Sequence, residues 1–170
     1  ASTRDYVLCP IGSGKLWLSI VRKVQSLDIS TKVIGVTPKG RNAFFLNNLT
    51  RNLDSVADKL TAPYTHLREE VLAESPNHIV AEASERQLKK AYNKAKQRNI
   101  ECEPSGAAGF VVYDQKFCNQ HEIDKSDDVV VVSTGKGFKY EVDQTRNTEC
   151  KRRSKIGTLA TLFVAGTFCF

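Results

Sequence analysis

The segment Tyr6-Val7-Leu8-Cys9-Pro10-Ile11-Gly12-Ser13-Gly14-Lys15-Leu16 passes from an apolar run, across two glycines, into an amphipathic stretch. Apolar residues recur at helical spacing as far as Leu27. The segment therefore predicts a strand over 6–9, a tight loop and a helix from Gly14 to about Ser26. Such a helix start directs unpaired N–H groups and the positive end of the helix dipole at one point. We expect this loop to bind a phosphate group, and a turn without a ligand is the alternative.

Two well-known phosphate motifs do not fit the loop. A nucleoside-triphosphate P-loop needs a glycine where this chain has Cys9, and a serine or threonine where it has Leu16. A dinucleotide fingerprint needs a third glycine at a fixed offset, and the chain has none there.

Four apolar runs predict the strands of a single sheet. They cover residues 6–9, 32–36, 78–83 and 128–133, and helical patterns lie between them. The first strand, helix and strand make a right-handed parallel unit. The last run holds four consecutive valines, which is typical of a strand buried on both faces. The sequence thus predicts an α/β fold: an open, mainly parallel three-layer sheet with helices on both faces.

Local signals mark where further helices begin. Ser84 and Gln87 form a capping box ahead of an apolar stripe with helical spacing. Ser105 is expected to be the N-cap of another helix, in which the small residues at 106–109 allow close packing. Shorter helices are expected at 41–48 and 65–73. Residues 133–137 follow the last strand, so they and the loop at 12–16 both lie where ligands bind in open α/β sheets.

Charge and cysteine content narrow the class of protein. The formal net charge is +6, but the basic helix face at 86–98 lacks interleaved aromatics or a groove-reading motif. We therefore expect a solvated helix face and no binding of nucleic acid.

Five cysteines without a C-x-x-C pair favour reduced thiols in a cytoplasmic protein. The three isolated histidines predict no zinc site. The apolar stretch 156–170 is shorter than the roughly 20 residues that span a bilayer, so no membrane is expected.

Five motifs, in the same order along the chain, resemble those of pyridoxal-phosphate enzymes of the tryptophan synthase β fold type. They are the glycine-rich phosphate loop at Pro10–Leu16, the following strand at Lys32–Pro38, the S-x-A-D-G-L-like segment Ser55–Leu60, the E-P-S-G-A-A motif in Glu103–Gly109 and the T-G-x-G-L-K-like end at Val132–Lys139. The resemblance covers residues 5–140. It is greatest to threonine synthases, followed by threonine or serine dehydratases and cysteine synthases.

This resemblance implies pyridoxal 5′-phosphate as the cofactor. The cofactor phosphate would be held by the backbone N–H groups of five residues: Gly12, Ser13, Gly14, Lys15 and Leu16. Thr134 would meet the pyridine nitrogen, with Ser133 as the other candidate. Glu103 would line the pocket, unless it is an ordinary loop acid. Because a neutral hydroxyl does not force the ring to stay protonated, the family chemistry expected is β- or γ-elimination or replacement on an amino acid.

The chain departs from the family pattern in three motifs. The phosphate loop carries Ser13 and Lys15 where all-glycine versions are common. Thr37 stands where several relatives carry a glutamate that helps to hold a metal ion, so no metal site is expected. Lys59 replaces the glycine of A-D-G-L, close to where the substrate would lie. In the family, the lysine that carries the cofactor lies in the N-terminal half, and no such lysine motif occurs in this sequence.

The chain is therefore interpreted as a C-terminal half, incomplete without an N-terminal half and with no catalytic residue of its own. Residues 1–140 would bind the cofactor phosphate, and residues 141–170 form a basic and then apolar tail. The expected partners are the missing N-terminal half, an amino-acid substrate and a second copy of the chain in a homodimer. The alternative is a non-catalytic, truncated or decayed module that binds an anion or a protein partner through the same loop.

Overall fold

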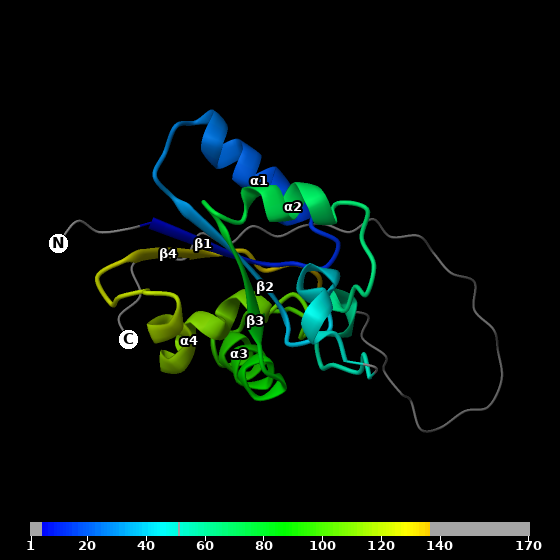
Figure 1. Cartoon of the computed structure of the whole chain (residues 1–170). Helices are drawn as coiled ribbons and strands as arrows, with labels where there is room; N and C mark the ends of the chain where they lie inside the picture. Colours follow the sequence, from blue (N-terminus) through cyan, green and yellow to red (C-terminus); the bar gives the residue numbers. More distant parts are fainter. Residues whose placement is uncertain (1–4, 51, 137–170) are drawn as a thin grey trace, which may run out of the picture.

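Four parallel strands form the centre of the molecule, which a computed structural model describes over residues 5–50 and 52–136 (Figure 1). The strands are β1 (Asp5–Pro10), β2 (Lys32–Pro38), β3 (Ile79–Ala83) and β4 (Asp128–Val131), in the sheet order β3-β2-β1-β4. Leu8 of β1 lies opposite Ile34 on one side and Val131 on the other, and all three strand pairs are parallel. The predicted open parallel sheet is confirmed.

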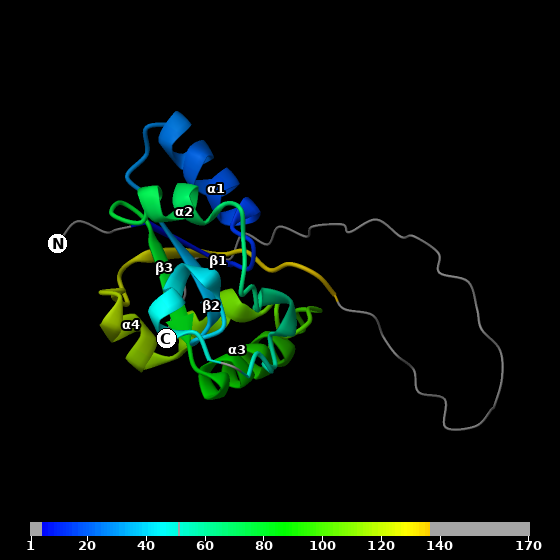
Figure 2. The ribbon, with the colours of Figure 1, turned by 45° about the vertical axis from the view of Figure 1, so that its right-hand side comes forward.

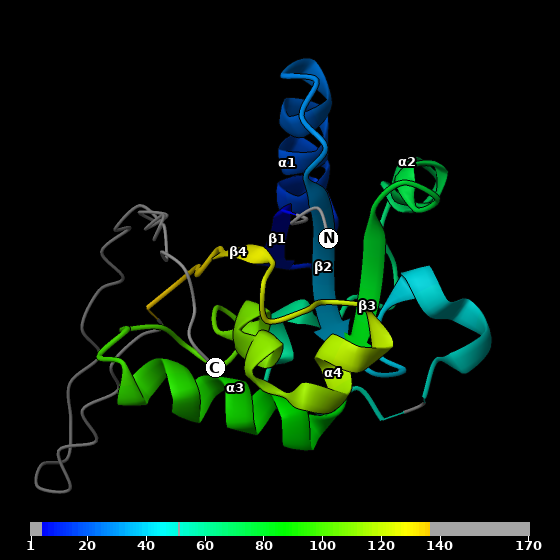
Figure 3. The ribbon, with the colours of Figure 1, turned by 90° about the vertical axis from the view of Figure 1, so that its left-hand side faces the viewer.

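Two helices cover one face of this sheet. α1 (Lys15–Ser26) and α2 (Arg68–Glu74) lie together on that side in all three ribbon views (Figures 1, 2 and 3). The helical spacing of apolar residues in α1 buries Trp17 and Val21 against Val33 of β2 and Val71 of α2. This packing fixes α1 over the sheet with its N-terminal end directly after β1.

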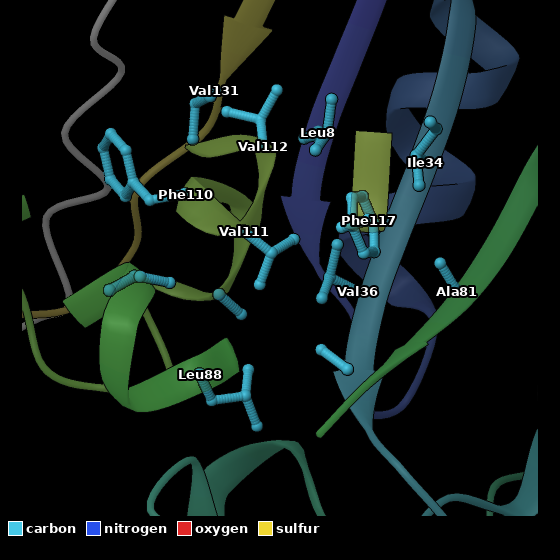
Figure 4. Packing of buried hydrophobic residues seen from close by; sticks show 14 of the residues in the cluster. Leu8, Ile34, Val36, Ala81, Leu88, Phe110, Val111, Val112, Phe117 and Val131 are labelled. Atoms are coloured by element: carbon cyan, nitrogen blue, oxygen red, sulfur yellow. The ribbon is translucent and has the colours of Figure 1, made fainter. Parts of the chain in front are cut away.

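The opposite face is covered by α3 (Glu85–Gln97), the 3₁₀ segment η3 (Ala108–Tyr113) and α4 (Gln115–Gln120). Figure 4 shows the core between the layers, where side chains of β1 and β2 meet Leu88, Val111 and Phe117. The alternation of the strands sends Leu8 and Ile34 to this face, and Cys9 and Val33 to the other. Helices on both faces give the three layers that the sequence predicts.

Several predicted element starts are confirmed and others shift. The capping box is present: the Ser84 hydroxyl accepts from the Gln87 N–H, and the Gln87 side chain bonds back to Ser84. The helix predicted at 65–73 begins only at Arg68, and the one at 41–48 is the 3₁₀ segment η1 (Ala43–Asn48). β2 continues through Thr37 and Pro38, which the sequence places in a turn.

Two predictions from the sequence are wrong in detail. Ser105 caps no helix, because its hydroxyl accepts a hydrogen bond from the distant Lys59 N–H at 3.2 Å. The strand β4 is not covered on both faces along its whole length, because Val130 is half-buried. The cause is that α1 packs mainly on β1 and β2. The tail 141–170 lies outside the described residues. None of the described helices has both the length and the apolar character that crossing a membrane requires.

Candidate functional site

The two segments predicted to contact a ligand follow neighbouring strands. The loop at 11–14 leaves the carboxyl end of β1, and residues 132–136 leave the carboxyl end of β4. A hydrogen bond from the Val132 N–H to the Leu8 carbonyl oxygen, 2.8 Å long, continues the pairing past the end of β4. The segment between β2 and α2 lies at the same end of the sheet (Figure 2). Ligands of open α/β sheets bind at this edge.

The loop after β1 presents free amide groups. Gly14 is the N-cap of α1 and has a φ of 100°, a left-handed conformation that glycine adopts without strain. Within the described part of the chain, no hydrogen bond engages the amide N–H groups from Gly12 to Leu16. Ser13 and Lys15 are exposed, and Lys15 forms no ion pair with another described residue. The loop therefore has the donors that an anion needs at a helix start.

Two side chains hold the carbonyl groups of this loop from behind. The Asn42 Nδ2 group donates to the Gly12 carbonyl oxygen at 3.0 Å, and the Thr65 hydroxyl donates to the Ser13 carbonyl oxygen at 2.7 Å. Both side chains are buried. No motif or periodicity in the sequence marks either residue, because both lie in irregular segments far along the chain from the loop.

Lys59 joins three parts of the site. It lies in the 3₁₀ segment η2 (Asp58–Leu60), and its carbonyl oxygen would be 3.1 Å from a Cβ atom on Gly12. Its N–H donates to the Ser105 hydroxyl, and its ammonium group forms an ion pair with the Glu103 carboxylate. Glu103 in turn lies beside Gly135, whose ideal Cβ would be 2.7 Å from Glu103 Oε1. The structure therefore places Glu103 next to the turn after β4.

The turn after β4 packs against the loop that contains Gly106. The Thr134 N–H donates to the Gly106 carbonyl oxygen at 3.4 Å, and the Glu103 N–H donates to the Gly135 carbonyl oxygen at 2.9 Å. Ser133 is buried, while Thr134 is half-buried. Burial raises the pKa of the Cys102 thiol, and the nearby Ser133 hydroxyl opposes that rise.

Thr37 is fully buried at the end of β2. Its hydroxyl donates to the Leu60 carbonyl oxygen at 3.4 Å and accepts from Asn42 Nδ2 at 3.1 Å. Over residues 5–50 and 52–136 there is no group of three histidine, cysteine or acidic side chains arranged to hold a metal ion.

The model of one protein family, described as "Pyridoxal-phosphate dependent enzyme", matches residues 2–135. The chain belongs to this family. The cofactor of the family is pyridoxal 5′-phosphate. No curated protein sequence is significantly similar to the chain.

Solved structures of similar fold include a racemase, a deaminase and an ammonia-lyase. The maize serine racemase structure is 16% identical, with a TM-score of 0.64, and the match covers 82% of this chain and 45% of that one. A threonine deaminase from T.th. is 21% identical with a TM-score of 0.62, covering 80% and 50%. An L-serine ammonia-lyase from the fungus Rhizomucor miehei is 22% identical with a TM-score of 0.61, covering 76% and 44%. The chain thus spans about half the length of these structures.

The residues at the carboxyl edge of the sheet fit the cofactor phosphate. The free N–H groups from Gly12 to Leu16 are donors without a partner among the described residues, and the helix dipole of α1 adds positive potential there. No acidic residue lies in the first turn of α1 to repel a phosphate. The particular cofactor contacts of this loop, and those of Ser133 and Thr134, remain predictions.

Proposed function

We propose that this chain is the cofactor-binding portion of a pyridoxal-phosphate lyase or synthase that carries out elimination or replacement on an amino acid, in the manner of threonine synthases. The observation that carries the proposal is the pairing of β1 with β4, which sets the phosphate-loop donors and the Thr134 hydroxyl beyond the ends of neighbouring strands. One group would bind the phosphate end of the cofactor, and the other its ring.

The chain's own groups would bind and orient the cofactor. When bound, pyridoxal phosphate supplies an electron sink for bonds broken next to the amino group of the substrate. The N–H groups of the loop and the dipole of α1 would hold the phosphate without a metal ion. The Thr134 hydroxyl would bond to the ring nitrogen without fixing a positive charge on it, as a carboxylate would, and this favours elimination and replacement.

Thr134 is the better of the two candidates for the ring contact. Ser133 is buried, whereas Thr134 is half-buried at the surface of the turn and can reach a ligand there. Glu103, held by Lys59, would border the pocket near the same turn.

The proposal includes an N-terminal half that carries the cofactor-binding lysine. Two apolar side chains near the loop are exposed: Leu16, at its end, is 38% exposed, and Tyr64, which precedes Thr65, is 81% exposed. An N-terminal half that covers the loop would bury both. We also propose that the complete protein acts on an amino-acid substrate and forms a homodimer.

Cys9, Cys102 and Cys118 are free thiols, which supports a reducing, cytoplasmic location. Cys150 and Cys169 lie outside the described residues.

The second candidate is a non-catalytic module that binds an anion or a partner through the loop. Lys59 favours it, because a lysine paired with Glu103 stands where the family motif has a glycine. The two candidate functions make different predictions. The enzyme portion should become active when a lysine-bearing half is added, and the non-catalytic module should not.

The test adds pyridoxal phosphate to the 170-residue chain, with inorganic phosphate as competitor, and then reduces with borohydride and maps the modified lysines. We expect phosphate-competed binding, no single stoichiometric adduct and no turnover of serine or threonine. Addition of the N-terminal half of the full-length protein should then restore turnover. A single adduct with turnover by the chain alone would refute the proposal that the lysine lies in the N-terminal half. Binding that never leads to turnover, even with that half added, would support the non-catalytic module. Gly14→Asp, which places a carboxylate in the loop, is the matched control that should not bind.

A further inference from the structure

We infer that Asn42 and Thr65 are positioning residues for the phosphate-binding amides, an inference that rests on the proposed function. Neither side chain would contact the anion itself, because neither carries a charge and their donors are bonded to the loop. Each acts on a peptide group of the loop, by holding its carbonyl oxygen on the side of the protein interior.

The orientation of the loop amides follows from the geometry of a trans peptide. Its carbonyl oxygen and the next N–H point in opposite directions, and no peptide bond in the described residues is cis. Asn42 fixes the Gly12 carbonyl, so the Ser13 N–H points away from Asn42. Thr65 fixes the Ser13 carbonyl, so the Gly14 N–H points away from Thr65. Two consecutive amides are thereby turned outward, as an anion site at this helix start requires.

Asn42 is itself held in one orientation. Its Oδ1 accepts from the Phe44 N–H at 3.2 Å. Its Nδ2 group faces three oxygens, those of the Gly12 carbonyl, the Thr37 hydroxyl and the Leu60 carbonyl, at 3.0 to 3.2 Å. A reversed amide would place oxygen against oxygen at the two carbonyl groups and N–H against the Phe44 N–H. The side chain is fully buried, so water cannot replace these bonds cheaply.

Thr65 is constrained in a similar way. Its hydroxyl donates to the Ser13 carbonyl and accepts from the Leu67 N–H at 3.2 Å, so the single hydroxyl hydrogen is committed to the loop. Without that bond, the peptide between Ser13 and Gly14 can rotate and turn a carbonyl oxygen toward the anion. The loss should therefore appear in anion affinity beyond any loss of stability.

The experiment compares matched variants of the 170-residue chain by titration with inorganic phosphate and with pyridoxal phosphate. Thr65→Val keeps the shape but removes the donor, and Thr65→Ser keeps the hydroxyl. We expect Thr65→Val to weaken both affinities about tenfold, the equivalent of one hydrogen bond, and Thr65→Ser to stay within about twofold of the parent. Asn42→Asp, which has no N–H donor, should weaken them at least as much.

Ser84→Ala is the control for stability, because it removes a helix cap that does not touch the loop. It should lower the melting temperature and leave both affinities unchanged. Amide NMR gives a second measurement: phosphate should shift the Gly14 N–H signal in the parent and in Thr65→Ser, and much less in Thr65→Val. Thr65→Val that binds as well as Ser84→Ala would overturn the inference alone. A parent chain that binds neither anion would overturn the proposed function together with it.

Discussion

Gly106 lies so close to Thr134 that a Cβ atom on Gly106 would be 1.5 Å from the Thr134 carbonyl oxygen. No side chain is tolerated at that distance, so the backbone of one segment must move if any residue other than glycine is present. The glycine of the E-P-S-G-A-A motif thus sets how the turn after β4 lies.

Gly106→Ala should displace the turn that carries Thr134. We expect the free energy of unfolding to fall by about 2 kcal/mol or more, as in overpacked cores, and pyridoxal phosphate affinity to fall with it. Urea unfolding and cofactor titration measure the two effects. Gly40→Ala is a useful control, because its φ of 68° also penalises alanine, while its backbone bonds to Glu82 and Thr50 and not to the turn. It should lose stability and keep its affinity, and equal affinity in Gly106→Ala would contradict the prediction.

Gly14→Ala should damage the phosphate loop for two reasons. The φ of 100° strains an alanine by about 1–2 kcal/mol, and its Cβ would lie 2.7 Å from Val71 Cγ2. We expect a lower melting temperature and a weaker phosphate affinity. In a Val71→Ala background the contact is relieved and the strain is not, so part of the effect of Gly14→Ala should remain. Complete recovery there would show that strain at Gly14 plays no part.

Substitutions at Thr134 test its predicted contact with the ring nitrogen. Thr134→Asp should raise the pKa of the bound pyridine nitrogen, since a carboxylate favours the protonated ring. Thr134→Ala should weaken binding by about fivefold to tenfold, the value of one hydrogen bond. The absorption spectrum of the bound cofactor across pH reports both changes. If Thr134 variants resemble the parent and Ser133→Ala does not, Ser133 makes the contact.

Two histidines, His78, which is buried, and His121, which is half-buried, should make stability depend on pH. Burial lowers the pKa of His78 and of His121, and Lys32 lowers both further, while Glu74 opposes the shift at His78. As the pH falls below about 6.5, the unfolded chain takes up protons that the folded chain does not, so the free energy of unfolding declines until the lower folded pKa values are passed.

The His78 contribution can be isolated. Its Nδ1 accepts from the Val33 N–H at 3.2 Å, so protonation of that atom breaks the bond. Urea unfolding at several pH values between about 5 and 7.5 should show the decline, and His78→Gln should flatten it. An equally steep decline in His78→Gln would assign the effect to His121 or to the carboxylates.

The local parts of this architecture can be predicted from sequence because their signals are local. The capping box at Ser84 and the glycine-rich start of α1 depend on residues within a few positions of each other. The helix cap predicted at Ser105 is wrong because a competing donor, the Lys59 N–H, comes from a distant segment. The roles of Asn42 and Thr65 cannot be predicted from sequence for the same reason. Their acceptors lie far along the chain, and no periodic pattern indicates a buried amide or hydroxyl.

The pairing of the first strand with the last has a consequence for folding kinetics. β1 can pair with β2 early, because the chain between them is short, but residues 5–8 must wait for residues 128–131 before β4 joins the sheet. Contacts between such distant segments close large loops, which costs entropy and slows folding. The capacity to bind pyridoxal phosphate should therefore arise in the slowest refolding phase, after most helical signal has returned. A nascent chain whose β4 has not yet emerged from the ribosome would contain the predicted phosphate loop but not the turn that carries Thr134.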